Sequence, residues 1–390
     1  MRKNPSQTIC PEGSVGDLMN NRDYRKQAAT FGSATLSETR ACRELLLRDQ
    51  ARQAVAALEE TPLLRVDHLV KSYPIRKGLL KIRSKTFTAV DDVSFVIRTG
   101  ETLGIVGESG SGKTTTGRTT LLLEKPSSGA IEFDGHRLLT LKSGDLRRLR
   151  RNMQMIFQDP FDSLDSRQTI GEILEEPFLI HGIGSLSERK RAVANLLDRV
   201  GMARASIDQY PHEFSGGQRQ RIGIARAIAL KPKLIVCDEP VSSLDVSIQG
   251  QILNLLIDLQ REMGLAYLFI SHNLSVVKHV SDRIAVMYRG RFVETADAET
   301  IYRKPLHPYT RLLIASIPTI DAIKAPVPGR DIADAPPVLV ATGCAFAPRC
   351  SRREDICDRM RPELVSVQSP GEPEHRVACH LFPGKAPSSP

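Results

Sequence analysis

The fold of this chain is decided by the stretch Thr102-Leu103-Gly104-Ile105-Val106-Gly107-Glu108-Ser109-Gly110-Ser111-Gly112-Lys113-Thr114. Its first part is a short apolar run that predicts a buried strand. Residues 107–114 match the pattern G-x-x-x-x-G-K-[ST], in which a glycine-rich loop places backbone N–H groups around phosphate oxygens at the start of a helix. The order of strand, loop and helix predicts a nucleotide-binding P-loop rather than a chance glycine-rich turn.

The last two residues of this loop carry most of its predicted chemistry. We expect Lys113 to reach the β- and γ-phosphates of a nucleoside triphosphate, and Thr114 to offer its hydroxyl to Mg²⁺. The predicted nucleotide contacts are Gly107, Glu108, Ser109, Gly110, Ser111, Gly112, Lys113, Thr114 and Thr115. By itself, the loop indicates only that a nucleoside triphosphate is bound.

A second apolar run, residues 234–237, ends in the acidic pair Asp238 and Glu239. At the carboxyl end of a strand beside the phosphate loop, Asp238 is expected to hold the Mg²⁺ shell. Glu239 is expected to orient and deprotonate the attacking water. Such a pair is common on its own, and it becomes informative only together with the loop.

The string Phe214-Ser215-Gly216-Gly217-Gln218 separates this chain from kinases and GTPases that share the phosphate loop. On this string the chain resembles the ABC ATPase family, whose signature normally has Leu in place of Phe214. The resemblance implies that Ser215, Gly216, Gly217 and Gln218, at a helix N-terminus, contact the ATP held by the loop of a partner ATPase. Two such subunits would then enclose two nucleotides.

Four further positions match the family in the expected order along the chain. The resemblance implies that Gln158 contacts Mg²⁺ and water, and that His272 contacts the γ-phosphate. It also implies that Asp245 communicates across the dimer and that Tyr73 stacks on adenine, although a strand tyrosine is often only packing. The predicted catalytic residues are therefore Glu239, His272, Gln158 and Lys113. The predicted Mg²⁺ ligands are Thr114, Gln158 and Asp238.

Sequences flanking this machinery resemble the oligopeptide/dipeptide importer branch, at residues 155–165 and 305–313. Residues 62–64 and 115–118 resemble the second, F-type ATPase subunit of that branch. The resemblance covers about residues 61–383. It implies an ATPase that energises the import of peptides or related small solutes. It also implies that residues 158–164 couple to a permease helix, with Phe161 and Leu164 in contact.

The same resemblance implies the partners of the chain. They are a second homologous ATPase in a heterodimer, two transmembrane permeases and a substrate-binding protein. The chain would be peripheral at the cytoplasmic face of the inner membrane. The alternative is a soluble ABC ATPase that acts on nucleic acid or the ribosome, but such proteins usually carry two cassettes or long coiled-coil inserts.

Bulk composition is consistent with this reading. The chain has 390 residues and a net charge of +9. Its densest basic cluster, residues 148–151, lacks interleaved aromatics and any recognisable nucleic-acid module, so we expect no nucleic-acid partner. No apolar run approaches the roughly 18 residues of a membrane-spanning helix. The N-terminus lacks the apolar segment of a secretory signal.

Alternating strand and helix patterns predict an α/β fold: a P-loop NTPase (RecA-like) core with a parallel sheet. We expect an N-terminal extension at residues 1–60, helix-like from residue 36 and not necessarily ordered throughout. The nucleotide-binding domain is expected at residues 61–304, with an antiparallel β subdomain and an inserted helical subdomain at about residues 160–230. A small Cys-rich C-terminal domain is expected at residues 305–390.

Four of the seven cysteines lie in the last 50 residues, namely Cys344, Cys350, Cys357 and Cys379. Without a paired Cys-x-x-Cys unit, four thiols favour an iron–sulfur cluster over a structural zinc ion. The string Gly-Cys-x-Phe-x-x-Arg-Cys also resembles the tail of importer ATPases, and this resemblance implies a [4Fe–4S] cluster. Zinc and packing without metal remain the alternatives. Cys10 and Cys42 lie outside this set, and Cys237 is expected to be a small buried hydrophobe.

Overall fold

The structure is a computed structural model, and it describes residues 62–76, 84–159, 163–317, 342–367 and 374–382. The predicted N-terminal extension, its helix-like segment and Cys10 and Cys42 lie outside the described residues. The described residues belong to one compact unit.

The main sheet is built around the strand that precedes the phosphate loop. Its strand order is β11-β12-β10-β9-β3-β8-β7-β6. The strands are β3 (Thr102–Val106), β6 (Met153–Ile156), β7 (Leu234–Asp238), β8 (Ala266–Ser271), β9 (Arg283–Tyr288), β10 (Arg291–Asp297), β11 (Val365–Ser366) and β12 (Arg376–Val377). β6, β7, β8, β3 and β9 run parallel, and β10 is antiparallel to β9. The predicted α/β fold with a parallel sheet is confirmed.

A second, antiparallel sheet has the strand order β2-β1-β4-β5. Its strands are β1 (Leu64–Arg76), β2 (Ser84–Ile97), β4 (Ser128–Phe133) and β5 (His136–Arg137). Val66 lies opposite Phe95 on one side and Ile131 on the other, and all three side chains are buried. Period-two alternation therefore gives this sheet one apolar face, as the sequence predicts for the antiparallel β subdomain.

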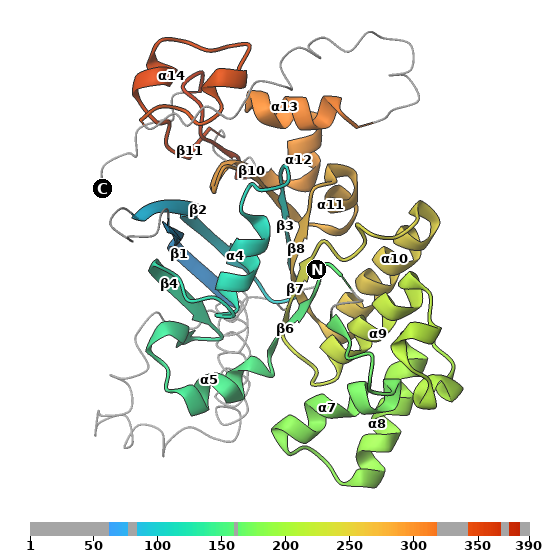
Figure 1. Cartoon of the computed structure of the whole chain (residues 1–390). Helices are drawn as coiled ribbons and strands as arrows, with labels where there is room; N and C mark the ends of the chain where they lie inside the picture. The colour runs from blue at the N-terminus through green and yellow to red at the C-terminus, as the bar shows by residue number, and fades with distance from the viewer. Residues whose placement is uncertain (1–61, 77–83, 160–162, 318–341, 368–373, 383–390) are drawn as a thin grey trace, which may run out of the picture. The chain divides into compact units, whose positions relative to one another are not determined.

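Helices cover the main sheet and form the inserted subdomain (Figure 1). The α-helices are α4 (Lys113–Thr120), α5 (Ser143–Arg150), α7 (Ile170–His181), α8 (Leu186–Arg199), α9 (Gly216–Ile228), α10 (Val246–Met263), α11 (Leu274–Val280), α12 (Ala298–Arg303), α13 (Pro308–Ala315) and α14 (Ile356–Arg359). Short 3₁₀ helices span Leu138–Thr140, Arg204–Asp208, Pro211–Glu213 and Ala347–Arg349.

The helical subdomain has sharply defined helix starts. α7, α8 and α9 each begin with a capping box, in which the N-cap hydroxyl accepts from the third backbone N–H and that residue's side chain accepts from the N-cap backbone. The N-cap residues are Thr169, Ser185 and Ser215. Each cap stabilises its helix by about 1 kcal/mol. The capping box at Ser215 therefore fixes where the signature string enters its helix.

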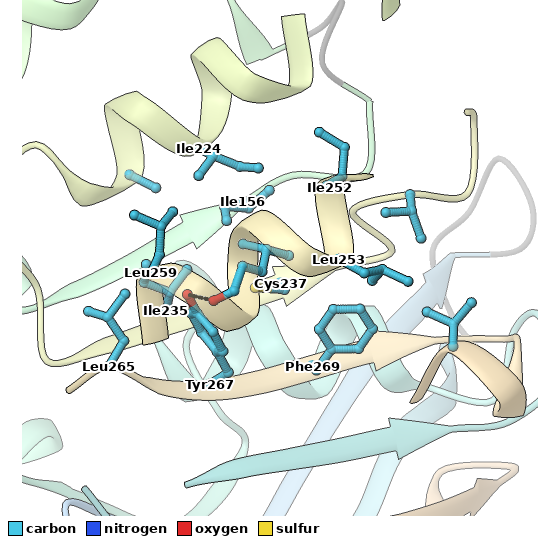
Figure 2. Close-up of a cluster of buried hydrophobic side chains, with 14 of the residues drawn as sticks. Ile156, Ile224, Ile235, Cys237, Ile252, Leu253, Leu259, Leu265, Tyr267 and Phe269 are labelled. Atoms are coloured by element: carbon cyan, nitrogen blue, oxygen red, sulfur yellow. Dashed lines mark hydrogen bonds between the residues drawn. The ribbon is translucent and has the colours of Figure 1, made fainter. Parts of the chain in front are cut away.

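The core between the main sheet and α10 is drawn in Figure 2. Tyr267 and Phe269 of β8 lie on the same face as Ile235 and Cys237 of β7, because side chains two apart point the same way. The Tyr267 hydroxyl donates to the backbone oxygen of Leu256 on α10, at 3.0 Å. Cys237 is fully buried, and burial raises the pKa of its thiol, so it is the small buried hydrophobe that the sequence predicts.

The tail adds strands to the main sheet. In β12, Val377 pairs with Glu294 of β10 and with Val365 of β11. The C-terminal segment, drawn in red, thus continues the sheet across the predicted boundary at residues 304 and 305 (Figure 1). A separate small Cys-rich domain is not confirmed. The physical reason is that β10 pairs with β9 on one side only, and β12 of the tail forms hydrogen bonds with its other edge.

A buried polar network ties the tail to β10. Glu294 is fully buried, and its carboxylate accepts from the backbone N–H groups of Leu306 and His307 at 2.8 and 2.9 Å. The same carboxylate accepts from His375 Nε2 at 2.8 Å. His307 caps α13, because its Nδ1 accepts from the backbone N–H of Tyr309 at 3.0 Å. Burial lowers the pKa of His307 to about 4, and the Glu294 charge opposes this shift.

The depressed pKa of His307 predicts a pH-dependent stability. Between about pH 6.5 and 4 the unfolded chain binds a proton at this histidine that the folded chain excludes, so the free energy of unfolding falls as the pH falls. We expect His307 to account for a loss of up to about 3 kcal/mol across this window. Urea unfolding at a series of pH values measures it. Asn in His307→Asn keeps an acceptor for the cap and does not titrate, so equal pH slopes for both proteins would refute the assignment.

Candidate nucleotide-binding site

The phosphate loop joins β3 to α4 at the centre of the main sheet (Figure 1). A Cβ atom on Gly107 would lie 2.1 Å from the backbone oxygen of Met287. Gly112 has φ +104°, and a Cβ there would lie 2.2 Å from the backbone oxygen of Ala89. Neither position tolerates a side chain, because neighbouring backbone closes on the loop. The glycine spacing in the sequence therefore reflects the packing of this loop.

Lys113 begins α4 and points back over the loop. Its ammonium donates to the backbone oxygens of Gly107 at 2.7 Å and Glu108 at 2.9 Å, and the side chain is 4% exposed. Burial lowers the pKa of Lys113, while Glu239, Asp238 and Glu108 act in the opposite direction. The ammonium group is thus held where the loop would place phosphate oxygens.

Thr114 and Asp238 form the predicted Mg²⁺-binding pair. The Thr114 hydroxyl donates to Asp238 Oδ1 at 2.8 Å. Asp238 is fully buried, and among the described residues neither its Oδ2 nor the buried Ser111 Oγ has a hydrogen-bond partner. Burial is the main cause that raises the pKa of Asp238. An unpartnered carboxylate oxygen beside a threonine hydroxyl suits Mg²⁺, which prefers oxygen ligands, so the residues fit this ion.

Glu239 follows β7 and brings two other predicted residues to the loop. Its backbone has φ +45°, and its N–H donates to the backbone oxygen of Ile270 in β8 at 2.9 Å. Its Oε2 accepts from His272 Nδ1 at 3.0 Å and from Gln158 Nε2 at 3.3 Å. The Glu239 side chain is 12% exposed. Two residues predicted to be catalytic, Gln158 and His272, therefore converge from separate segments on the carboxylate of a third, Glu239.

A cavity of about 770 Å³ lies over the loop. The predicted site residues that line it are Glu108, Ser109, Gly110, Gly112, Lys113, Thr114, Thr115, Gln158, Glu239 and His272. Gly107, Ser111 and Asp238 are not among its lining residues, and all three are buried. A second cavity, of about 910 Å³, shares Gln158, Glu239 and His272 with the first. The predicted hydrolytic residues thus stand where the two cavities meet.

The signature string lies away from this cavity. Ser215 is the exposed N-cap of α9, its hydroxyl accepts from the Gln218 N–H, and Gln218 Oε1 accepts from the Ser215 N–H at 2.9 Å. Ser215, Gly216, Gly217 and Gln218 do not line either cavity, and neither does Asp245, the N-cap of α10. Among the described residues of one chain, therefore, the signature string does not reach the cavity over the phosphate loop.

Two aromatic residues lie opposite each other on neighbouring strands of the antiparallel sheet, and only one of them was predicted. Tyr73 pairs with Phe87 in the β1–β2 register. The Tyr73 hydroxyl bonds to Glu124, and its ring is not among those that line the cavity. Phe87 lines the cavity and is 52% exposed. Sequence reasoning missed Phe87, because register shifts within β1 cannot be read from the sequence.

The tail also supplies cavity residues that the sequence did not indicate. Leu312, Leu313 and Ser316, in α13 and at its end, line the cavity, and so does Arg349. In the sequence, Arg349 stood out only as the arginine of the string that ends at Cys350, with no predicted role in nucleotide binding. Its contact with the loop depends on how the tail packs against the main sheet.

Two of the four tail cysteines are joined through their backbones. The backbone N–H of Cys344 donates to the backbone oxygen of Cys357 at 2.7 Å. Burial raises the pKa of the Cys379 thiol to about 11, and the charges of Cys344, Cys350 and Cys357 contribute. No group of three or more His, Cys, Asp or Glu side chains in the described part of the chain is arranged to hold a metal ion. A cluster or zinc ion at these cysteines is therefore not supported by the geometry.

Comparison with known proteins places this site in a family. The ABC transporter family matches residues 90–242, and the C-terminal region of oligopeptide/dipeptide transporters matches residues 293–357. The oligopeptide transport ATP-binding protein AppF of Bacillus subtilis (strain 168) is 47% identical over 338 residues, which are 84% of this chain and 99% of that protein. The chain belongs to the ABC transporter family, in its oligopeptide/dipeptide branch. This ABC protein is thus an ATPase of the class that its signature string predicts.

Two further similarities support this assignment. The glutathione import ATP-binding protein GsiA of Salmonella choleraesuis is 53% identical over 264 residues, which are 68% of this ABC protein and 42% of GsiA. The dimeric post-hydrolysis structure of the ATP-binding cassette MJ0796, bound to ADP and Pi, matches with a TM-score of 0.54 and 28% identity. That match covers 60% of this chain and 98% of that one. Within the described residues, no helix has the length and apolar character needed to cross a membrane.

Proposed function

We propose that this ABC ATPase energises an importer of peptides or related small solutes. The observation that carries the proposal is the convergence of Gln158 and His272 on the Glu239 carboxylate beside the phosphate loop. The relatives add the cargo class, because AppF is named for oligopeptide transport and GsiA for glutathione import. Action on nucleic acid or the ribosome gains no support from either relative.

The residues of the site then have separate tasks. Lys113 exchanges its two bonds to loop carbonyls for phosphate oxygens of ATP. Glu239 accepts the proton of the attacking water, and the bonds from Gln158 and His272 fix the direction of its carboxylate. His272 is 54% exposed, so it can also reach the γ-phosphate. Thr114, Asp238 and Gln158 would hold Mg²⁺, which neutralises charge on the phosphates when bound. Tyr73 remains a proposed adenine contact.

Separation of the loop from the signature supports a composite site. Because Ser215, Gly216, Gly217 and Gln218 lie outside the cavity over their own loop, we propose that they complete the site of a second, homologous ATPase. The exposed N-terminus of α9 can then contact the γ-phosphate bound by the partner. Asp245, at the start of α10, would lie at the same dimer interface. We expect the partner to be a different chain.

A groove beside Gln158 suits contact with a permease. A cavity of about 290 Å³ is lined by Phe157, by Leu123 after α4 and by Ile180 of α7. Leu123 and Ile180 are about half exposed, at 49% and 51%. The predicted contact at Leu164 is wrong, because this side chain is 4% exposed and packs in the core. Phe161 lies outside the described residues.

Photo-crosslinking tests the importer assignment. A benzophenone amino acid at Leu123 or Ile180, in the ATPase co-expressed with the permeases of its importer, should give adducts with a permease. The same probe at Met360, which is 57% exposed near α14, is the control and should give none. If neither groove position captures a permease while ATP hydrolysis is retained, the coupling assignment fails. We place the assembled protein at the cytoplasmic face of the inner membrane, where a substrate-binding protein delivers the solute from the other side.

We further propose that Cys344, Cys350, Cys357 and Cys379 hold a [4Fe–4S] cluster, with zinc as the alternative. A donor set made of cysteines alone, and the backbone hydrogen bond of 2.7 Å that joins Cys344 to Cys357, support the cluster. Iron, sulfide and zinc analysis of anaerobically purified protein tests it. Cys357→Ser should lose the iron, whereas Cys237→Ala, in the core, should retain it. Iron-free protein that contains zinc would overturn the cluster.

A further inference from the structure

The tail reaches a side chain of the phosphate loop through a partly buried ion pair. The guanidinium of Arg349 donates to both carboxylate oxygens of Glu108, at 2.8 and 2.9 Å. Glu108 follows Gly107 in the loop, and Arg349 lies 241 residues further along the chain. The Arg349 side chain is 12% exposed. A paired, parallel contact of this kind is among the stronger hydrogen-bonding arrangements in proteins, since it fixes direction as well as distance.

Aromatic side chains hold the guanidinium in place. Its carbon lies 5.9 Å from the ring centre of Tyr288 and 5.7 Å from that of Phe346. Tyr288 ends β9, next to β3, and Phe346 belongs to the tail. The two rings meet edge to face, with centroids 5.4 Å apart. The contacts with these two rings therefore hold the Arg349 guanidinium against the main sheet, where it bonds to Glu108.

The backbone of Glu108 is held by the same region. Its N–H donates to the hydroxyl of Tyr309 at 2.8 Å, and Tyr309 is fully buried in α13. The Tyr309 ring packs on Tyr288 at 4.6 Å and on Phe346 at 5.5 Å. The side chain and the backbone N–H of Glu108 are thus held by Arg349 and Tyr309, which both follow β9 in the chain.

Two consequences for ATP binding follow from this arrangement. The Glu108 backbone oxygen is one of the two acceptors of the Lys113 ammonium, so a displacement of Glu108 would also displace that lysine's anchor. The Glu108 carboxylate lines the cavity, and without Arg349 its charge would face the phosphates of ATP unpaired. The negative charges of the carboxylate and the phosphates would repel each other, and a partly enclosed site screens this repulsion less than open water does.

We propose that Arg349 is a positioning residue of the ATP site. It fixes Glu108, neutralises its carboxylate and thereby makes the tail a determinant of nucleotide affinity. The proposal concerns this ABC protein's own ATP site and does not depend on which solute is imported. Because Arg349 directly precedes Cys350, the segment that carries the cysteines acts on the phosphate loop without contacting the reacting atoms.

Matched variants of the full-length chain test the proposal. We expect Arg349→Gln to raise the Kd for ATP and the KM of hydrolysis about tenfold, with kcat changed less than twofold. Arg349→Lys keeps the charge and should recover part of the affinity. The control is Arg353→Gln, which removes an exposed arginine paired with Asp358 in the same segment and should change neither constant.

A double-mutant cycle separates the pair from a general effect on folding. Because Glu108 and Arg349 act as one unit, Glu108→Gln combined with Arg349→Gln should weaken ATP binding no more than Arg349→Gln alone. If Arg349→Gln does not fold, Arg349→Lys, which keeps the charge but loses the paired contact, must still raise the Kd. An unchanged Kd in the folded single variants, a loss confined to kcat, or additive effects in the double variant would overturn the proposal.

Discussion

Glu239→Gln should reduce steady-state ATP hydrolysis by about 100-fold or more, because the amide cannot accept the proton of the attacking water. The substitution keeps the shape of the side chain, and its amide oxygen can still accept from His272 Nδ1 and Gln158 Nε2. ATP binding should therefore be retained. Phosphate release by the assembled complex measures the first effect, and equilibrium binding of ATP measures the second.

A second glutamate serves as the control for this substitution. Glu262 is 53% exposed and pairs with Arg199, away from the loop, so Glu262→Gln should leave hydrolysis unchanged. Hydrolysis at the wild-type rate in Glu239→Gln would remove Glu239 from the role of general base. Loss of both binding and hydrolysis would assign it instead to the structure of the site.

Lys113→Ala should weaken ATP binding by about 100-fold, which corresponds to roughly 2.7 kcal/mol and to the loss of one or two charge-assisted hydrogen bonds to phosphate. The ammonium is positioned before ATP arrives, since it already bonds to the backbone oxygens of Gly107 and Glu108. Hydrolysis should fall with binding. Equilibrium titration with ATP measures the change in Kd.

The matched control is the exposed Lys142, at the N-cap of α5, whose removal takes away the same charge far from the loop. Lys142→Ala should bind ATP as the wild type does. If Lys113→Ala bound ATP equally well, the cavity over the loop would not be the ATP site. A similar loss in both variants would indicate a general effect of charge.

Local sequence was sufficient for the parts of the site that are contiguous or end a strand. The loop could be predicted because Gly107 and Gly112 are required by close backbone approach, which leaves a fixed glycine spacing. Asp238 and Glu239 could be placed because an apolar run predicts a strand, and the ends of parallel strands meet at one edge. The helical insert was predictable for a similar reason, since its helices start at capping residues such as Thr169 and Ser185.

Contacts between distant segments could not be predicted in the same way. Phe87 reaches the cavity through the register of β1 and β2, which shifts several times along the pair. Arg349 reaches Glu108 only because the tail packs beside β9 and β10. No local pattern records either contact. The attachment of the Cys-rich tail to the main sheet could not be predicted for the same reason, since β12 pairs with β10 across a long stretch of sequence.

The coupling of this ATP site to import is tested most directly by uptake of short labelled peptides into proteoliposomes. The vesicles would hold this ATPase, the proposed partner ATPase and the permeases, with ATP supplied on the ATPase side and the binding protein on the other. The account predicts ATP-dependent accumulation with the wild-type chain and none with Glu239→Gln, although that variant still binds ATP. Accumulation at the wild-type rate with Glu239→Gln would contradict it.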